Sequence, residues 1–268
     1  MFHDMPPSLT DGVPRPPRHM SHVNLSLTDR ILDVALQRRD KKNALTADMY
    51  AAMTEALRSA DANEAVHVVY LHGQGDLFTS GNDVADFLDP AVRARGAAQD
   101  FVRTIAATRT PIVAAAGGLA IGVGATMLLH CDLVVAATGT RFQFPFVPLG
   151  LCPEAGSSLL LPQLAGAQRA AALLLLGDPF DADHAREIGM VNSVVPPELL
   201  IEEGRAVAAR LAAQPRDALF TTKALLRRPG LAALREHMEV ELQEFGRLLE
   251  GDAARASFSA FLARRAGP

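Results

Sequence analysis

A long uncharged segment limits what this chain can fold into. Residues 112–129 carry no charged side chain, and a segment of this length reaches the lower limit for a membrane-spanning helix. However, residues 112–116 form a short apolar run that is typical of a buried strand, and two glycines at 117–118 interrupt it. Asp132 also follows closely, without a basic flank. We therefore expect a buried strand and a core helix here, and no membrane span.

Two glycine-rich loops are candidates for binding a negatively charged oxygen. Gly122 and Gly124 open the predicted core helix, and Gly81 lies in a loop, residues 72–83, that follows a predicted strand. Glycine lets a backbone approach a ligand closely, and N–H groups at a helix start can receive a negative oxygen. Two N–H groups from separate loops form an oxyanion hole if they converge on one oxygen, although each loop alone is more simply explained as a turn. The glycine spacing matches neither a dinucleotide-binding nor a P-loop motif.

The composition argues against several classes of function. The 268 residues carry a formal net charge of −4, which gives no reason to expect nucleic-acid binding. The two cysteines, Cys131 and Cys152, are too few for a disulfide scaffold and fit a reducing, cytoplasmic location. The eight histidines show no H-E-x-x-H or other metal-ligand spacing, and no G-x-S-x-G motif is present. We therefore predict a cytoplasmic protein without a metal site.

Hydrophobic spacing predicts an α/β core followed by helices. Residues 23–27 and 31–36 alternate apolar and polar side chains around a short turn, which predicts a hairpin, and Thr46 can cap the next helix. Further strands are predicted at 66–71, 112–116, 133–136 and 190–195, with helices between them at 96–107, 168–176 and 181–189. Beyond Pro197 the patterns are helical only. We predict a proline-rich disordered leader at residues 1–20, a core carrying the active site at residues 21–200, and a helical region at residues 201–268.

Four motifs in series resemble a known enzyme superfamily. They are Ser80-Gly-Asn-Asp83 with Phe87, Ala120-Ile-Gly-Val-Gly124, Cys131-Asp132 and Pro153-Glu-Ala-Gly-Ser-Ser158. Their order and spacing resemble the crotonase (enoyl-CoA hydratase/isomerase) superfamily, and most of all its peroxisomal-type Δ3,Δ2-enoyl-CoA isomerases. The resemblance implies a spiral of ββα units whose helical C-terminal region assembles homotrimers or hexamers. It also implies an acyl-CoA substrate, with no cofactor beyond the coenzyme A that the substrate carries.

The resemblance also assigns roles to individual residues. It places the thioester oxygen between the backbone N–H groups of Asn82 and Val123. Hydratases of the superfamily carry two glutamates that hold and activate a water, and the matching positions here are Thr126 and Phe146, neither of which exchanges a proton with water near neutrality. Glu154 stands where the isomerase subgroup has its catalytic glutamate. The implied reaction is a shift of a 3-enoyl-CoA double bond to the 2-position, with Glu154 carrying the proton.

A structural role is the alternative for Glu154. A carboxylate near a helix start is favoured by the helix dipole, and Ser157 and Ser158 would then act as local caps.

The remaining substrate contacts are implied by position and are open to simpler explanations. A basic cluster at residues 38–42 lies where the superfamily binds coenzyme A, but it is equally explained as a solvated loop. Asp83 can also be a solvated or capping residue, and core packing accounts for the phenylalanines equally well. The predicted substrate-binding residues are Arg39, Lys41, Ala44, Ser80, Asp83, Phe87, Gly122 and Phe146.

Two other kinds of function stay open at this point. One is another crotonase reaction, such as hydration, dienoyl-CoA isomerisation or thioester hydrolysis, with Glu154 reused as a base. The other is a non-catalytic protein that binds acyl-CoA or acts as a scaffold.

Overall fold

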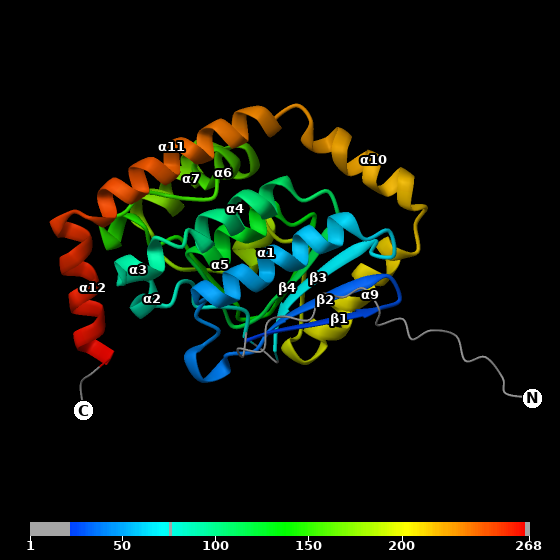
Figure 1. Ribbon diagram of the computed structural model, residues 1–268, viewed down its shortest axis with the longest axis horizontal. Coiled ribbons are helices and arrows are strands. Elements are labelled where there is room, and N and C mark those ends of the chain that lie inside the picture. Colours follow the sequence, from blue (N-terminus) through cyan, green and yellow to red (C-terminus); the bar gives the residue numbers. More distant parts are fainter. Residues whose placement is uncertain (1–21, 75–76, 266–268) are drawn as a thin grey trace, which may run out of the picture.

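A six-stranded sheet forms the centre of the molecule (Figure 1). The computed structural model describes residues 22–74 and 77–265, so the predicted leader at residues 1–20 lies outside the described residues. The strand order is β1-β2-β3-β4-β6-β9; β1 and β2 form the predicted antiparallel hairpin, and the later strands are all parallel to their neighbours. The strands are β1 (Val23–Thr28), β2 (Ile31–Leu36), β3 (Val68–Gly73), β4 (Ile112–Ala116), β6 (Leu133–Ala137) and β9 (Ser193–Val195).

The sheet is covered by helices on both faces, which explains the uninterrupted apolar run of β4. Ile112, Ala114 and Ala116 pack on the side of α1 (Ala47–Ala62) and α4 (Ala97–Ala107). The alternate residues of β4 pack against α9 (Leu200–Ala212) on the other side. A strand that is buried on both faces needs apolar side chains at every position. The predicted strand at 112–116 is therefore confirmed, and so is the cap of α1, where Thr46 accepts a hydrogen bond from the Met49 N–H.

A second, three-stranded sheet has the order β5-β7-β8 and was not predicted. Its strands are β5 (Leu119–Ile121), β7 (Arg141–Gln143) and β8 (Phe180–Asp181). Strands of two or three residues are too short to show an alternating pattern. They exist because segments far apart in the chain pair with one another, for example Leu119 with Arg141.

The predicted core helix after β4 is shorter than expected. It consists of α5 (Val123–Thr126) and a turn of 3-10 helix, η2 (Met127–His130), and its residues are almost all buried. Likewise the predicted helix at 168–176 is divided into α7 (Ala167–Ala171) and a π-helical turn, η4 (Ala172–Leu176). The other short helices are η1 (Arg39–Lys41), α2 (Val84–Leu88), α3 (Pro90–Arg93), η3 (Val147–Leu149), α6 (Ser157–Ala165), α8 (Ala182–Glu187) and η5 (Pro197–Leu199).

The C-terminal region contains helices and no strand within the part of the chain that the structure describes. It includes α10 (Arg216–Arg227), α11 (Leu231–Leu249) and α12 (Asp252–Arg265). In Figure 1, α11 runs across the top of the molecule from α10 to α12 and passes α6 and α7. Its apolar residues Leu234, Met238 and Leu249 pack inward. No helix among the described residues has both the length and the apolar character needed to cross a membrane.

Candidate active site

The two glycine-rich loops lie against each other in the folded protein. The N–H of Phe78 donates to the carbonyl of Gly117 at 2.8 Å, and the N–H of Thr79 donates to the carbonyl of Leu119 at 2.9 Å. The N–H of Ile121 donates back to the carbonyl of Thr79 at 3.3 Å. This pairing brings the loop after β3 beside the loop after β4, which the sequence alone did not establish.

Glycine is required at the residue before each of the two candidate N–H groups. Gly81, before Asn82, has φ 89°, and a Cβ there would lie 2.6 Å from the carbonyl oxygen of Ile121. Gly122, before Val123, has φ 57°. Among the described residues, neither the N–H of Asn82 nor that of Val123 donates a hydrogen bond. The Val123 N–H is unpaired because it belongs to the first turn of α5. Both donors are therefore available to an oxygen atom.

Asn82, Val123 and Glu154 line one cavity, which we call the inner cavity. It is lined by residues from six separate segments of the chain. These include Tyr50, Asn82, Val123, Glu154, Leu242 and Phe245. The structure thus brings together the three residues that the sequence predicts as the catalytic group and the oxyanion hole.

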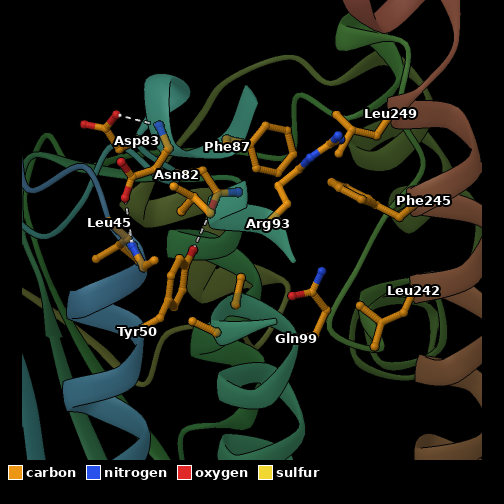
Figure 2. Close-up of a pocket in the computed structure, with 16 residues that line it drawn as sticks. Leu45, Tyr50, Asn82, Asp83, Phe87, Arg93, Gln99, Leu242, Phe245 and Leu249 are labelled. Carbon is orange, nitrogen blue, oxygen red and sulfur yellow. Dashed lines mark hydrogen bonds between the residues drawn. The ribbon is translucent and has the colours of Figure 1, made fainter. Parts of the chain in front are cut away.

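A larger outer cavity shares several walls with the inner cavity (Figure 2). Tyr50, Asn82 and Phe87 border both, as do Leu242 and Phe245 from α11. Figure 2 shows Phe87 on one side facing Phe245 and Leu249 on the other. Together the two cavities form a mostly apolar cleft between α11 and the helices α1, α2 and α4, which suits an acyl chain.

The carboxyl of Glu154 is buried and carries a raised pKa. Its residue is 8% exposed, and one oxygen, Oε1, accepts a short hydrogen bond from the hydroxyl of Thr126. Burial raises the pKa of Glu154 to about 7; the Thr126 hydrogen bond lowers it, and the charge of Glu241 raises it further. A carboxyl with a pKa near neutrality can both accept and return a proton, which is the property that general acid–base catalysis requires.

Glu154 precedes a tight turn rather than capping the next helix. Ala155 has φ 57°, unusual for a residue with a side chain, and Gly156 follows with φ 71°. The hydroxyl of Ser157 donates to the carbonyl oxygen of Glu154 at 2.6 Å, and the residue before α6 is Gly156, which has no side chain to cap the helix. Among the described residues, the Glu154 side chain therefore makes no hydrogen bond that caps α6. That side chain is directed to Thr126 instead.

Tyr50 also belongs to this site, although no motif in the sequence indicates it. Its hydroxyl donates to Oδ1 of Asn82 at 2.5 Å and thereby orients that side chain (Figure 2). Burial, followed by the nearby charge of Glu154, raises the pKa of Tyr50 well above its ordinary value. Tyr50 therefore stays protonated and serves as a hydrogen-bond donor.

The basic cluster at residues 38–42 divides into one structural arginine and an exposed remainder. The Arg38 guanidinium donates to the carbonyl of Ala44 at 2.9 Å and to Asp83 at 2.6 Å. Burial raises the pKa of Asp83, but the Arg38 hydrogen bond and charge outweigh it and hold that pKa below its ordinary value. Asp83 also caps α2 by accepting from the N–H groups of its first turn. Arg39 and Lys41 are exposed.

The other predicted substrate contacts have different surroundings. Phe87 lines both cavities, and Gly122 holds the bend before Val123. Ala44 is buried, and the N–H of Ser80 donates to the Lys42 carbonyl at 3.0 Å. Phe146 is buried with its ring against Phe245, the centroids being 6.4 Å apart, and is not among the described residues that line either cavity. Their contacts with a substrate stay predictions.

No group of three or more His, Cys, Asp or Glu side chains within residues 22–74 and 77–265 could hold a metal ion. The inner cavity combines the buried carboxyl of Glu154 with the unpaired N–H groups of Asn82 and Val123.

Comparisons with known proteins show the family to which the chain is similar. The sequence model of the enoyl-CoA hydratase/isomerase family matches residues 27–268. The chain is similar to the 1,2-epoxyphenylacetyl-CoA isomerase of Escherichia coli (strain K12), with 32% identity over 259 residues that cover 92% of this chain and 95% of that protein. It is also similar to the crotonyl-CoA hydratase of Syntrophomonas wolfei, with 31% identity over 253 residues covering 92% and 97%. Among solved structures, Pseudomonas aeruginosa OdaA superposes with a TM-score of 0.87 and 38% identity, covering 90% of this chain and 99% of that one.

Proposed function

Because the chain belongs to the enoyl-CoA hydratase/isomerase family, we propose that it moves the double bond of a 3-enoyl-CoA to the 2-position. The crotonase fold and the acyl-CoA chemistry come with the family. The specific reaction is our proposal, and one observation carries it. Of the described residues that line the inner cavity, Glu154 is the only carboxylate, and it shares that cavity with the two residues whose N–H groups are unpaired.

The chemistry of the two candidate reactions differs in what it needs from the protein. Adding water to a double bond needs a positioned water with an acid and a base. Moving a double bond needs one group that removes a proton from one carbon and returns it to another. By the resemblance described above, Thr126 and Phe146 match the positions of the two hydratase glutamates. Thr126 is buried, and its hydroxyl donates to Glu154. A single titrating group near neutrality supports isomerisation.

The proposed reaction proceeds in two proton transfers. Ionised Glu154 removes a proton from C2, which the thioester and the neighbouring C3–C4 double bond make acidic. The electron pair of the C2–H bond delocalises into a dienolate, and the N–H groups of Asn82 and Val123 stabilise its oxygen. Glu154 then returns the proton to C4, and the double bond is left between C2 and C3, conjugated with the thioester.

General magnitudes indicate which groups matter most. One missing oxyanion donor typically lowers turnover by about 10²–10³-fold. A positioned general base contributes about 10²–10⁴-fold. We therefore expect Glu154 to be the most sensitive single side chain in the site.

Hydration is the second candidate, because one of the similar proteins is named a crotonyl-CoA hydratase. Under that alternative, Glu154 would activate a water without a second glutamate. Incubation with crotonyl-CoA separates the two reactions. Robust formation of a 3-hydroxyacyl-CoA, without isomerisation of a 3-enoyl-CoA, would overturn the proposal.

The direct test replaces the carboxyl alone. Glu154→Gln should abolish most of the rise in conjugated-enoyl absorbance when the protein is mixed with 3-enoyl-CoA. Glu244→Gln is a matched control, because Glu244 lies exposed on α11 and pairs only with Arg247 among the described residues. Near-normal turnover by a folded Glu154→Gln protein would reject Glu154 as the catalytic base. If the unmodified protein binds acyl-CoA tightly but turns over no enoyl ester, a non-catalytic binding protein is favoured instead. The homotrimer or hexamer, the cytoplasmic location and the lack of a separate cofactor stay predictions.

A further inference from the structure

A buried carboxylate from the C-terminal region touches the backbone just beyond Glu154. Glu241 lies on α11 and is 6% exposed. Its Oε2 accepts from the Gly156 N–H at 2.5 Å, and its Oε1 accepts from the Ser158 N–H at 2.9 Å. The Ser158 hydroxyl also lies 2.5 Å from Oε1. Three donors from the turn after Glu154 thus converge on one side chain that is more than eighty residues away in sequence.

The neighbours of Glu241 on α11 are fitted to the same turn. His237 Nε2 lies 2.7 Å from the Ser158 hydroxyl oxygen. Leu234 and Met238 close over Gly156 so tightly that a Cβ on Gly156 would lie 2.3 Å from the Leu234 side chain. These contacts fix α11 against residues 154–158 in one arrangement.

The turn needs such support because its backbone is strained. Ala155 adopts the left-handed region with φ 57°, which a residue with a Cβ keeps only when its surroundings enforce it. On one side, Nε2 of His130 lies 2.7 Å from the Ala155 carbonyl oxygen. On the other side, Glu241 holds the next N–H along the chain. The backbone that carries Glu154 is therefore clamped from two directions.

We propose that Glu241 is a positioning residue, whose carboxylate holds the 154–156 turn so that the Glu154 side chain faces the inner cavity. The inference rests on the proposed function, because it assigns Glu241 a role through the catalytic glutamate. It also gives α11 two tasks. Leu242 and Phe245 of this helix form part of the cavity wall, and Glu241 of the same helix holds the turn that carries Glu154. The site is complete only when α11 is docked.

The charge of Glu241 gives this role a signature that simple helix docking lacks. The titratable groups facing Glu154 and its turn are Tyr50 from α1, His130 from η2, and Glu241 and His237 from α11. His237 Nε2 lies 3.6 Å from Oε1 of Glu241. Tyr50 stays protonated, and burial lowers the pKa of His130 to about 4, so both are neutral near pH 7. The charge of Glu241 raises the pKa of Glu154, so removal of that charge should lower the pKa of Glu154.

The test compares Glu241→Gln with the exposed control Glu244→Gln. Glutamine keeps the size of the side chain but has no charge and presents a donor to the donors of the turn. We expect Glu241→Gln to lower kcat for 3-enoyl-CoA by about 10- to 100-fold, as small misplacements of a base do, with little change in KM. The acid limb of the kcat–pH profile should also move to lower pH. If kcat and the acid limb both match those of the control, or if only KM or thermal stability changes, the proposal is overturned.

A second variant and a second readout keep the test decisive. If Glu241→Gln fails to fold, Ser158→Ala removes a single donor, and an unchanged kcat in that variant overturns the proposal. Titration of the Glu154 carboxyl carbon by NMR, assigned from its loss in Glu154→Gln, reads its environment without any substrate. An inactive wild-type protein would refute the proposed function alone. An unchanged Glu154 titration in Glu241→Gln, together with unchanged amide exchange at Gly156 and Ser158, refutes the positioning role alone.

Discussion

Removing the hydroxyl of Thr126 should lower kcat at neutral pH, and kcat should recover at high pH. Thr126 is buried, and its hydroxyl donates to Oε1 of Glu154. This hydrogen bond favours the ionised carboxylate and so lowers the pKa of Glu154. Thr126→Val keeps the shape of the side chain and removes the donor. The pKa of Glu154 should therefore rise above its present value of about 7.

The size of the effect follows from the strength of one hydrogen bond. A hydrogen bond to a charged group contributes about 1.5–3 kcal/mol, and about 1.4 kcal/mol corresponds to one pKa unit. The pKa of Glu154 should thus rise by roughly one to two units. At pH 7 the ionised fraction would fall from about one half to roughly 1–10%, so turnover should fall about 5- to 50-fold.

The assay is the initial rate of conjugated-enoyl formation from 3-enoyl-CoA, measured from pH 6 to the upper limit of thioester stability. The Thr126→Val protein should show an acid limb displaced to higher pH and should recover most of its kcat there. Thr54→Val is the matched control, because Thr54 is also buried and its hydroxyl has no hydrogen-bond partner among the described residues. If the acid limb of Thr126→Val coincides with that of Thr54→Val, the hydrogen bond does not tune the base and the reasoning fails.

Two further predictions concern the oxyanion loop and the cost of burying the base. Gly81→Ala should lower kcat by about 10²–10³-fold, because its Cβ would lie 2.6 Å from the Ile121 carbonyl oxygen and displace the Asn82 N–H. The control is Gly96→Ala, which should leave kcat unchanged because Gly96 also has a positive φ, 65°, but no atom lies within 4 Å of its Cβ position. Equal kinetics for the two variants would contradict this prediction. Glu154→Gln should raise the free energy of unfolding above pH 7 by up to about 3 kcal/mol in urea denaturation. The folded pKa of about 7 lies above the ordinary value of 4.5, so the folded state binds more protons between these values and loses stability as pH rises through that window. The gain should vanish near pH 4, and an equal gain at both pH values would contradict the linkage.

The sequence predicted well the elements that are determined by the side chains of neighbouring residues in the chain. The hairpin of β1 and β2 has alternating side chains, and Thr46 caps α1 through its own hydroxyl. The second sheet was missed because its short strands depend on pairing with segments far away in the chain. For the same reason, neither glycine loop alone indicated that Thr79 pairs with Leu119 and Ile121.

The usual pattern of an amphipathic helix argues against Glu241 as a buried site residue. Polar residues of an amphipathic helix are expected on its solvent face. Yet Glu241 lies three residues after Met238 and seven after Leu234, a spacing that places it on the buried stripe of α11. The sequence contains this signal. It does not show that the N–H groups of residues 156 and 158 donate to Glu241, which is what makes burial of this carboxylate possible.

Position 126 connects the choice of reaction with the state of the base. By resemblance, a hydratase has a glutamate here, which together with a second one holds water. In this chain a second carboxylate at the same position would meet Glu154 inside a buried site, where two like charges oppose each other's ionisation. Threonine instead supplies a neutral donor, which stabilises the ionised Glu154 against the burial that raises its pKa. Thr126 thus has two effects. It leaves no second carboxylate to hold a water, and it keeps Glu154 able to lose its proton near neutrality.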